Sequence, residues 1–265
     1  MTSQLQKAEL LNRLHVPGDP LIVTNVWDAI SAKIVSEAPG VTALASASHS
    51  ISFAHGVPDN EGLTVDEAIR AARIIAGAVD LPVSIDFEKG YAPDATGVGA
   101  NVRRLIEESG AVGINLEDSL ESATGQQRSI DDSVARVAAA RGAGDATGIP
   151  LVINARVDTL ASGGDWAEAV TRANAYLEAG ADVIFLLGLK DEDLVKRALD
   201  EVNGRISTFG RAGSIPLKRL AELGVSRVSF GPQTMGLALA ALQRAATTLT
   251  ALDEYPEDLS FPFSL

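Results

Sequence analysis

The sequence predicts an α/β protein that folds as a (β/α)8 barrel of the TIM type, in a single domain over residues 1–265. Short apolar, β-branched segments recur along the chain, and each is followed by a segment with the apolar spacing of a helix. The connections between them are short, as in parallel sheets built from βαβ units. The length of 265 residues suits one such barrel, which occupies about 250 residues. An open, doubly wound sheet is the alternative that periodicity leaves open.

The strands are predicted from continuous apolar runs, because strands buried on both faces of a parallel sheet do not alternate with polar residues. The segment Val183–Leu187 is a clear example. The expected strands are, in chain order, Leu21–Thr24, Val41–Ala45, Pro82–Asp86, Gly113–Leu116, Leu151–Asn154, Val183–Leu187, Arg205–Thr208 and Ser226–Phe230.

The helices between these strands are marked by their start and stop residues. A short oxygen-bearing side chain stands three residues before an acid at Thr64, Ser129 and Asp165, which is typical of an N-terminal cap. Glycines that follow a helix and precede a strand mark the helix ends, at Gly110, Gly180 and Gly224.

Two further helices are predicted at the ends of the chain. Residues 2–14 form an extra N-terminal helix, with His15 expected at the surface. The C-terminal helix Gly236–Leu252 is rich in Ala and Leu. Such a helix is too apolar for the surface of a monomer, which predicts a homo-oligomer, either a dimer or a tetramer.

Composition excludes several classes of function. A net charge of −13 opposes binding to nucleic acid or to an anionic membrane surface. No apolar run approaches the about 20 residues of a membrane span, and the first residues lack the pattern of a signal peptide. The absence of cysteine excludes disulfides, zinc–thiolate sites and cysteine nucleophiles. We therefore expect a cytoplasmic protein that binds a small molecule.

Acidic residues gather at the predicted carboxyl ends of the strands, where the active sites of such barrels lie. They are Asp28, Asp86, Glu88, Glu117, Asp118 and Asp158, with Arg156 among them. Converging carboxylates repel one another unless a cation neutralises them. Oxygen ligands of this kind suit Mg²⁺ or Mn²⁺, and Arg156 would hold a substrate carboxylate through two hydrogen bonds. The alternative for any single acid is that it caps the following helix.

Three more features lie near this rim. Ser46, Ala47 and Ser48 are small residues at the end of a buried strand, where backbone N–H groups can approach an anion, although an ordinary tight loop has the same composition. The polar segment Ile51–Leu63 is expected to be a loop that closes over the mouth as a lid. His49 is a candidate for proton transfer or for a polar structural contact.

These residues resemble those of the isocitrate lyase / phosphoenolpyruvate mutase superfamily. The resemblance covers about residues 10–245. The matching segments are residues 25–28 (NVWD), 45–48 (ASAS), 56–59 (GVPD), 63–64 (LT), 84–91 (SIDFEKGY), 113–118 (GINLED) and 154–158 (NARVD). Each segment alone is a weak signal, but their ordered combination is specific.

The resemblance implies a barrel that binds Mg²⁺ and a 2-oxo acid or its enol form, and a tetramer in which the last helix packs on a neighbouring subunit. It implies Asp86 as a direct metal ligand, Glu88 and Glu117 as ligands through water, and Asp59 as a contact of the metal site or lid. The substrate-binding residues would be Ser46, Ala47, Ser48, Asp86 and Arg156. The candidate catalytic residues are Arg156, Glu117 and His49.

The sequence also departs from the family pattern. Residues 119–128 contain neither the cysteine that family lyases carry after the fourth strand nor the lysine and asparagine of the mutases. Leu187 replaces a polar residue at the end of the sixth strand. These departures argue against the usual cleavage of isocitrate or methylisocitrate and against mutase activity.

The leading hypothesis is therefore a Mg²⁺-dependent lyase or decarboxylase of a small, oxaloacetate-like 2-oxo acid, which acts through a metal-stabilised enolate. One alternative is P–C bond chemistry, as in a phosphoenolpyruvate or phosphonopyruvate mutase or hydrolase. Another is a protein that binds a 2-oxo acid without turnover.

Overall fold

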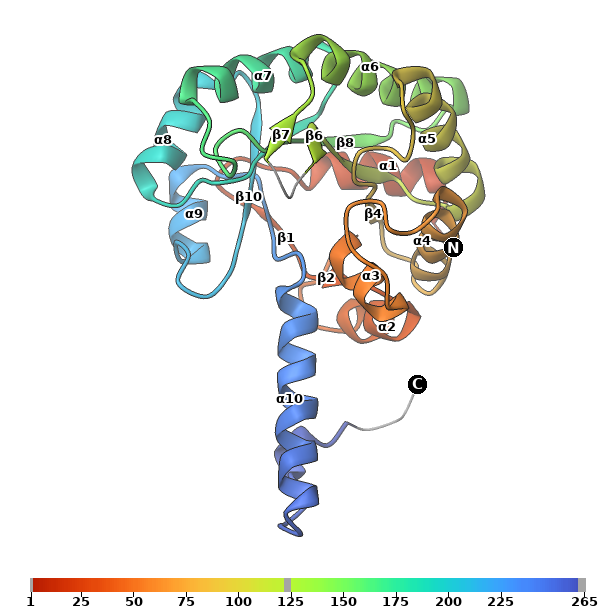
Figure 1. The fold of residues 1–265 in the computed structure, drawn as a ribbon, viewed down its shortest axis with the longest axis vertical. Coiled ribbons are helices and arrows are strands. Elements are labelled where there is room, and N and C mark those ends of the chain that lie inside the picture. Colours follow the sequence, from red (N-terminus) through yellow and green to blue (C-terminus); the bar gives the residue numbers. More distant parts are fainter. Residues whose placement is uncertain (1, 122–124, 262–265) are drawn as a thin grey trace.

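The computed structural model describes residues 2–121 and 125–261 and confirms the (β/α)8 barrel (Figure 1). Within these residues, a sheet of nine parallel strands follows the order β1-β11-β10-β9-β8-β5-β4-β3-β2. The strands are β1 (Leu21–Val23), β2 (Asn25–Val26), β3 (Leu44–Ser46), β4 (Val83–Asp86), β5 (Gly113–Glu117), β8 (Val152–Val157), β9 (Val183–Leu186), β10 (Arg205–Phe209) and β11 (Arg227–Ser229).

The barrel closes because its first strand is split into two consecutive parts. β1 pairs with β11, with Leu21 opposite Arg227, and β2 pairs with β3, with Asn25 opposite Ala45. The two ends of the sheet are thus neighbouring segments of the same stretch of chain, as a closed barrel requires. The strand expected at Val41–Ala45 begins later, since Val41 is held in a turn by its N–H bond to the Ala38 carbonyl.

The helices alternate with the strands and surround the barrel (Figure 1). Those on the barrel are α2 (Ala29–Ser36), α3 (Ser48–His55), α4 (Val65–Gly77), α5 (Ala95–Ser109), α6 (Ile130–Thr147), α7 (Trp166–Glu178), α8 (Glu192–Glu201) and α9 (Leu217–Leu223). The caps predicted at Thr64, Ser129 and Asp165 are confirmed, because each side chain accepts a hydrogen bond from the backbone N–H three residues later.

The predicted N-terminal helix is confirmed as α1 (Gln4–Arg13). Its residues Ala8 and Leu11 are fully buried, in a cluster with Leu21, Val112 and Val152 at the start of the barrel strands. The helix therefore plugs the end of the barrel opposite the carboxyl ends of the strands.

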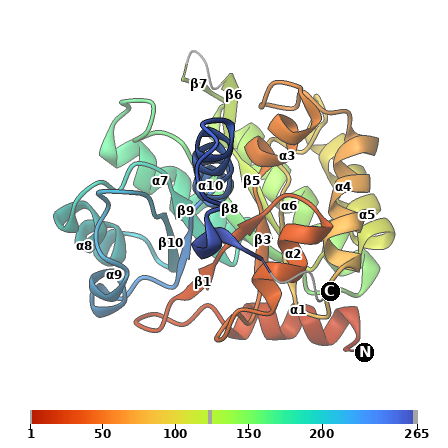
Figure 2. The same ribbon diagram turned by 90° about the horizontal axis from the view of Figure 1, so that it is seen from below.

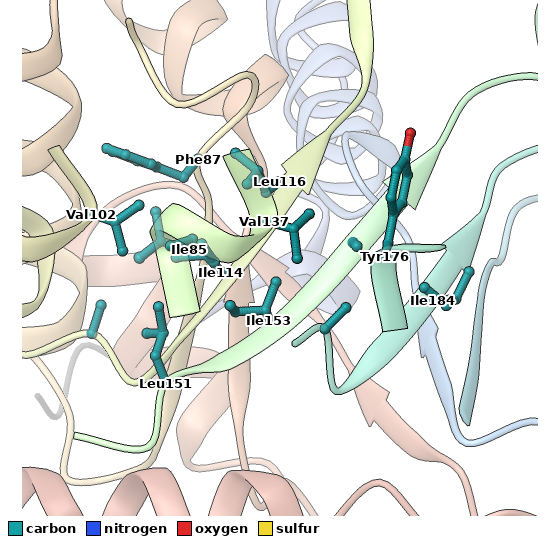
Figure 3. Packing of buried hydrophobic residues seen from close by; sticks show 14 of the residues in the cluster. Ile85, Phe87, Val102, Ile114, Leu116, Val137, Leu151, Ile153, Tyr176 and Ile184 are labelled. Atoms are coloured by element: carbon teal, nitrogen blue, oxygen red, sulfur yellow. The ribbon is translucent and has the colours of Figure 1, made fainter. Parts of the chain in front are cut away.

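The main apolar core lies between the sheet and the helices. Ile85, Ile114 and Ile153, on the adjacent strands β4, β5 and β8, pack in one cluster with Val102 of α5 and Val137 of α6 (Figure 3). Each such side chain contributes about 1.5–3 kcal/mol on burial. This packing fixes which face of each strand turns outward.

The alternate strand positions therefore face the interior of the barrel. Ser84 and Asn115 are buried there, and the carboxyl-end residues Asp86, Glu117 and Arg156 have the same parity on their strands. The polar inner face thus continues into the mouth of the barrel, where the candidate site lies.

Two connections differ from expectation. The segment expected to be a loop at Ile51–Leu63 is helical up to His55, within α3, so only its second half is irregular. After β5 the chain forms a short hairpin of β6 (Ser119–Glu121) and β7 (Gln126–Gln127). Residues 122–124 of the segment without the family's Cys and Lys lie outside the described residues.

The C-terminal helix α10 (Gln233–Thr250) extends away from the barrel, as Figure 1 shows, and Figure 2 views it nearly end-on. Met235 is its one buried residue within the described chain, whereas Leu237 and Leu242 are 75% and 67% exposed. A short 3-10 turn, Glu257–Leu259, follows it. Among the helices of the described ranges, α10 included, none is long and apolar enough to cross a bilayer.

Candidate active site at the mouth of the barrel

A cavity of about 280 Å³ opens at the carboxyl ends of the strands. It is lined by Asn25, Ala47, Ser48, His49, Asp59, Asp86, Asn115, Arg156, Phe185, Leu187, Phe209, Ser229, Gly231 and Pro232. One part of this lining is polar and acidic, and another, formed by Phe185, Leu187 and Phe209, is apolar. A second, open hollow of about 600 Å³ lies beside α1 at the other end of the barrel, away from these residues.

Asp86, the last residue of β4, is fixed from two sides. Its Oδ2 accepts hydrogen bonds from the Ser48 N–H at 3.1 Å and from the Ser48 hydroxyl at 2.8 Å. Its own N–H donates to the Ser46 hydroxyl at 2.9 Å. The carboxylate is therefore held in the cavity wall in a defined orientation.

The segment predicted to form an oxyanion cradle has a different role. Ser46 is fully buried behind the cavity, where it supports the Asp86 backbone. The Ala47 N–H donates to the Val26 carbonyl at 3.2 Å, as part of the contact between neighbouring strands. The Ala47 N–H is thus already used by the barrel, which corrects the expectation that it serves an anion. Ala47 and Ser48 still line the cavity.

Asp59 reaches the cavity from the loop after α3. Its Oδ1 is buried and has no hydrogen-bond partner within the described residues. A buried carboxylate oxygen without a partner is costly, and a bound cation would remove that cost. Since Asp86 lines the same cavity, the donor set fits a hard divalent cation such as Mg²⁺.

The loop that carries Asp59 is anchored to the segment after β4. The Glu61 N–H donates to Glu88 Oε2 at 2.6 Å, and the Tyr91 N–H donates to Glu61 Oε1 at 2.7 Å. Glu61, Glu88 and Tyr91 all have positive φ angles, between 47° and 62°. Non-glycine residues in this region are strained, and such strain concentrates at functional sites.

Glu88 lies behind the cavity instead of lining it. It is 2% exposed, and Tyr91 donates a hydroxyl hydrogen bond to its Oε1. The pKa of Glu88 is raised to about 7, mainly by burial and in part by the negative charges of Asp86 and Asp59, while the hydrogen bond from Tyr91 opposes the rise. A second acidic side chain, with a pKa close to neutral pH, therefore lies near Asp86.

Glu117 and Arg156 are paired behind Asp86. Arg156 Nη1 contacts Glu117 Oε2 at 2.6 Å, while its Nε and Nη2 donate to the two carboxylate oxygens of Asp158 at 2.6 and 2.8 Å. Burial raises the pKa of Glu117, and the charge of Arg156 opposes that rise. Arg156 also lines the cavity, and its two Nη groups each carry a further N–H beyond the one used by these acids.

Other acids at the predicted rim have structural roles. Asp28 caps α2, with its carboxylate accepting the Ser31 N–H at 2.7 Å. Asp118 faces away from the cavity and accepts hydrogen bonds from the Tyr176 hydroxyl at 2.8 Å and from the Asp158 N–H at 3.1 Å. Asp28 is thus a helix cap, as the alternative for a single acid predicts, whereas Asp118 makes structural contacts without capping a helix.

His49 lies on the exposed side of the cavity. It belongs to α3 and stacks on Phe53 with ring centroids 6.3 Å apart. Its position places an imidazole at the edge of the cavity, opposite the barrel interior.

The predicted metal residues do not form one direct coordination sphere. In the described part of the chain, no three His, Cys, Asp or Glu side chains come close enough to hold one ion. Asp59 and Asp86 line the cavity, whereas Glu88 and Glu117 are set back. This arrangement suits Mg²⁺, which binds through one or two carboxylates and keeps several waters.

Sequence reasoning missed the inward side chains that complete the cavity. The cavity is also lined by Asn115, Phe185 and Phe209. They were missed because the search considered charged residues at the ends of the predicted strands, and these three are uncharged. The available signal was parity, because Asn115 lies two residues before Glu117 and therefore on the same face of β5.

The fold and the cavity define a (β/α)8-barrel protein with carboxylates and an arginine at the mouth. Residues 11–250 match the family described as phosphoenolpyruvate phosphomutase. The chain belongs to this family, within the isocitrate lyase / phosphoenolpyruvate mutase superfamily, whose members include lyases and mutases.

Individual relatives differ in their chemistry. The oxaloacetate decarboxylase of Bradyrhizobium sp. is 31% identical, over 86% of this chain and 78% of the relative. A Burkholderia cenocepacia structure, provisionally assigned as a phosphonomutase, is 36% identical with a TM-score of 0.86, over 91% of this chain and 99% of that one. A phosphonopyruvate hydrolase solved with oxalate and Mg²⁺ has a TM-score of 0.83 at 23% identity, over 99% and 93% of the two chains, and so shares the fold.

Proposed function

We propose that this protein is a Mg²⁺-dependent lyase or decarboxylase of a 2-oxo acid of the oxaloacetate type. The observation that carries the proposal is the cavity in which Asp86, the partnerless oxygen of Asp59 and the Arg156 guanidinium meet. These groups are what a divalent cation and a substrate carboxylate require. The relative named oxaloacetate decarboxylase supports the reaction class.

In this proposal Asp86 would hold the metal directly, Glu88 and Glu117 would act through water, and Asp59 would be a further contact of the metal site. Mg²⁺, when bound, supplies positive charge that stabilises the negative charge developing on the 2-oxo oxygen. Mn²⁺ has the same preference for oxygen ligands.

The protein side chains orient the substrate. Arg156 binds the carboxylate next to the 2-oxo group, and Glu117 and Asp158 keep its guanidinium in place. Ser48 fixes Asp86 and stands at the edge of the substrate space. The apolar residues Phe185 and Phe209 exclude water from this region.

After the C–C bond is cleaved, the carbon atom of the resulting enolate must be protonated. In decarboxylation, the C–C bond to the departing carboxylate breaks, CO2 leaves, and the bonding electrons move to the 2-oxo oxygen as an enolate. The product carbon then takes up a proton as the 2-oxo group is restored. We assign this proton to His49, because it is the histidine that lines the cavity.

Oxaloacetate turnover tests the proposal, measured as pyruvate formed with Mg²⁺ and with a chelator. Asp86→Asn is expected to lower kcat/KM by about a hundredfold or more, since a direct ligand is lost. The matched control is Asp193→Asn, which makes the same charge change at a side chain that is 93% exposed. Equal turnover in both variants, or turnover unaffected by the chelator, would refute the assignment.

P–C bond chemistry is the second candidate, and the similarity to a provisionally assigned phosphonomutase favours it. It predicts that phosphonopyruvate is consumed, which ³¹P NMR detects directly. Ligand binding without turnover of any tested acid would instead favour a binding protein.

We also propose that the chain forms a homo-oligomer through α10. The helix leaves the barrel (Figure 1), and its Leu237 and Leu242 are exposed, so a monomer would present this apolar surface to water.

A further inference from the structure

We propose that the substrate is a 2-oxo acid with a second, terminal carboxylate, and that Lys190 and Arg211 bind this carboxylate in a neighbouring cavity. The inference rests on the proposed function and specifies its substrate as a dicarboxylate longer than oxaloacetate.

The neighbouring cavity has a volume of about 390 Å³. Its lining residues are Ala161, Leu187, Gly188, Leu189, Lys190, Thr208, Phe209, Arg211, Gly213 and Ser214. Leu187 and Phe209 belong to both cavities. These two side chains are thus the partition between the two cavities, and a ligand that passes them would occupy both.

The charges of the two cavities differ in sign. The active-site cavity contains Asp59 and Asp86, whereas the charged residues that line the neighbouring cavity are Lys190 and Arg211. Among the ion pairs of the described residues, none involves Lys190 or Arg211, in a chain of net charge −13. Two basic side chains without an ion-pair partner on one concave surface can attract an anion.

Both cations stand on the same rim as the proposed metal site. Lys190 follows β9 and Arg211 follows β10, so both come from the carboxyl ends of barrel strands. The loop of Arg211 is closed by Ser214, whose hydroxyl accepts the Arg211 N–H at 3.0 Å and donates to the Arg211 carbonyl at 2.7 Å. The backbone that carries the guanidinium is therefore held in position.

The segment that carries Lys190 is positioned by a close contact of the Gly188 backbone with a neighbouring loop. Gly188 has φ +112°, and a Cβ at this position would lie 2.9 Å from the Leu160 Cβ and 3.0 Å from the Ala161 nitrogen. The chain between β9 and Lys190 thus packs directly on the loop after β8. The partition itself is apolar, which suits a methylene chain between the two acidic ends of the ligand.

The division of tasks follows from these positions. Arg156 and the metal site bind the 2-oxo acid end, the methylene chain crosses Leu187 and Phe209, and Lys190 and Arg211 bind the far carboxylate. Both basic side chains are exposed, so each ion pair is expected to change affinity only about threefold, and the two together about tenfold.

Competition against oxalate in the presence of Mg²⁺ tests the inference. The ligands are 2-oxoglutarate, 2-oxoadipate and 2-oxopimelate, each compared with the neutral-tailed 2-oxo acid of equal chain length. At least one dicarboxylate is expected to bind about tenfold more tightly than its neutral counterpart. In a Lys190→Gln/Arg211→Gln double variant this preference is expected to disappear, while the affinity for oxalate is unchanged.

The matched control is Lys33→Gln, which removes one positive charge from α2, outside both cavities. It is expected to retain the preference. Equal affinity for every dicarboxylate and its neutral counterpart, or a preference that survives in the double variant, would overturn the inference while oxalate binding still supported the proposed function. Failure of oxalate to bind the unaltered protein would overturn the proposed function itself.

Discussion

Glu117 and Arg156 are register partners on the neighbouring strands β5 and β8, and their side chains meet at 2.6 Å. Asp158, two residues further along, holds the other side of the same guanidinium. Two acids therefore set the plane of the Arg156 guanidinium, so a substrate carboxylate bound there, as we propose, would meet donors that are already oriented. Such preorganisation lowers the cost of binding and orienting the substrate.

Replacing Arg156 with lysine tests this orientation, because lysine keeps the charge and loses the planar fork. We expect KM for the 2-oxo acid to rise about tenfold or more, which corresponds to one charge-assisted pair of hydrogen bonds. Steady-state kinetics measure the effect, with Arg70→Lys on α4 as the matched control. An unchanged KM in folded Arg156→Lys protein would show that this guanidinium does not bind the substrate.

A methyl group at Gly62 is expected to displace Asp59. A Cβ at Gly62 would lie 2.0 Å from the Pro58 carbonyl oxygen, so the loop must move. We expect Gly62→Ala to weaken the Mg²⁺-dependent binding of oxalate about tenfold and to cost about 1–3 kcal/mol of stability. Gly77→Ala in α4 is the control, since its Cβ would meet nothing within 4 Å. It is expected to stabilise the protein by about 0.5–1 kcal/mol. Similar effects of both substitutions would contradict this role of the loop.

His15 makes folding sensitive to acid. The pKa of His15 is lowered to about 3, mainly by burial and in part by the positive charge of Arg227, 3.5 Å away. The unfolded chain therefore binds a proton on His15 near pH 6.5 that the folded protein does not, and stability falls as the pH falls below about 6.5.

Between pH 7 and pH 5, we expect the free energy of unfolding of the His15→Gln variant to fall by about 2 kcal/mol less than that of the unaltered protein. Urea unfolding at the two pH values measures this difference, because the other titrating groups are common to both proteins. His55→Gln, at an exposed position, is expected to have no such effect. If His15→Gln and the unaltered protein showed the same pH dependence, His15 would not be neutral in the folded protein.

The exposed apolar residues of α10 predict that charged substitutions on this helix lower the oligomeric mass of the protein. We expect the unaltered protein to sediment as a dimer or tetramer and a Leu237→Glu/Leu242→Glu variant to sediment as a monomer, because two charges would be desolvated in the interface. Arg244→Glu on the same helix is a control for charge. A monomeric unaltered protein would exclude this interface.

The barrel itself was predictable from sequence because its signals are local. Continuous apolar runs and helix caps such as Thr64 depend on residues close together in the chain, and the structure confirms them. The placement of the candidate site was also predictable, because the backbone of a (β/α)8 barrel brings the carboxyl ends of all strands to the same end of the barrel.

The features that the sequence analysis missed depend mainly on contacts between residues far apart in the chain. His15 was expected at the surface, but α1 plugs the barrel and buries it next to Arg227, more than two hundred residues away in the chain. The Ala47 N–H was expected to serve an anion, but it bonds Val26 across the strands. The end of α3, Ile51–His55, was expected to belong to a loop because polar residues and the following Gly56 surround it, and such residues equally favour a loop.

The most direct test of the central claim is the binding of oxalate, measured by calorimetry with and without Mg²⁺. The account predicts that oxalate binds in the presence of Mg²⁺, that a chelator abolishes the binding, and that Asp86→Asn weakens it about a hundredfold while Asp193→Asn leaves it unchanged. Oxalate binding of equal strength with the chelator present, or in the Asp86→Asn variant, would contradict a metal-dependent 2-oxo acid site at the mouth of this barrel.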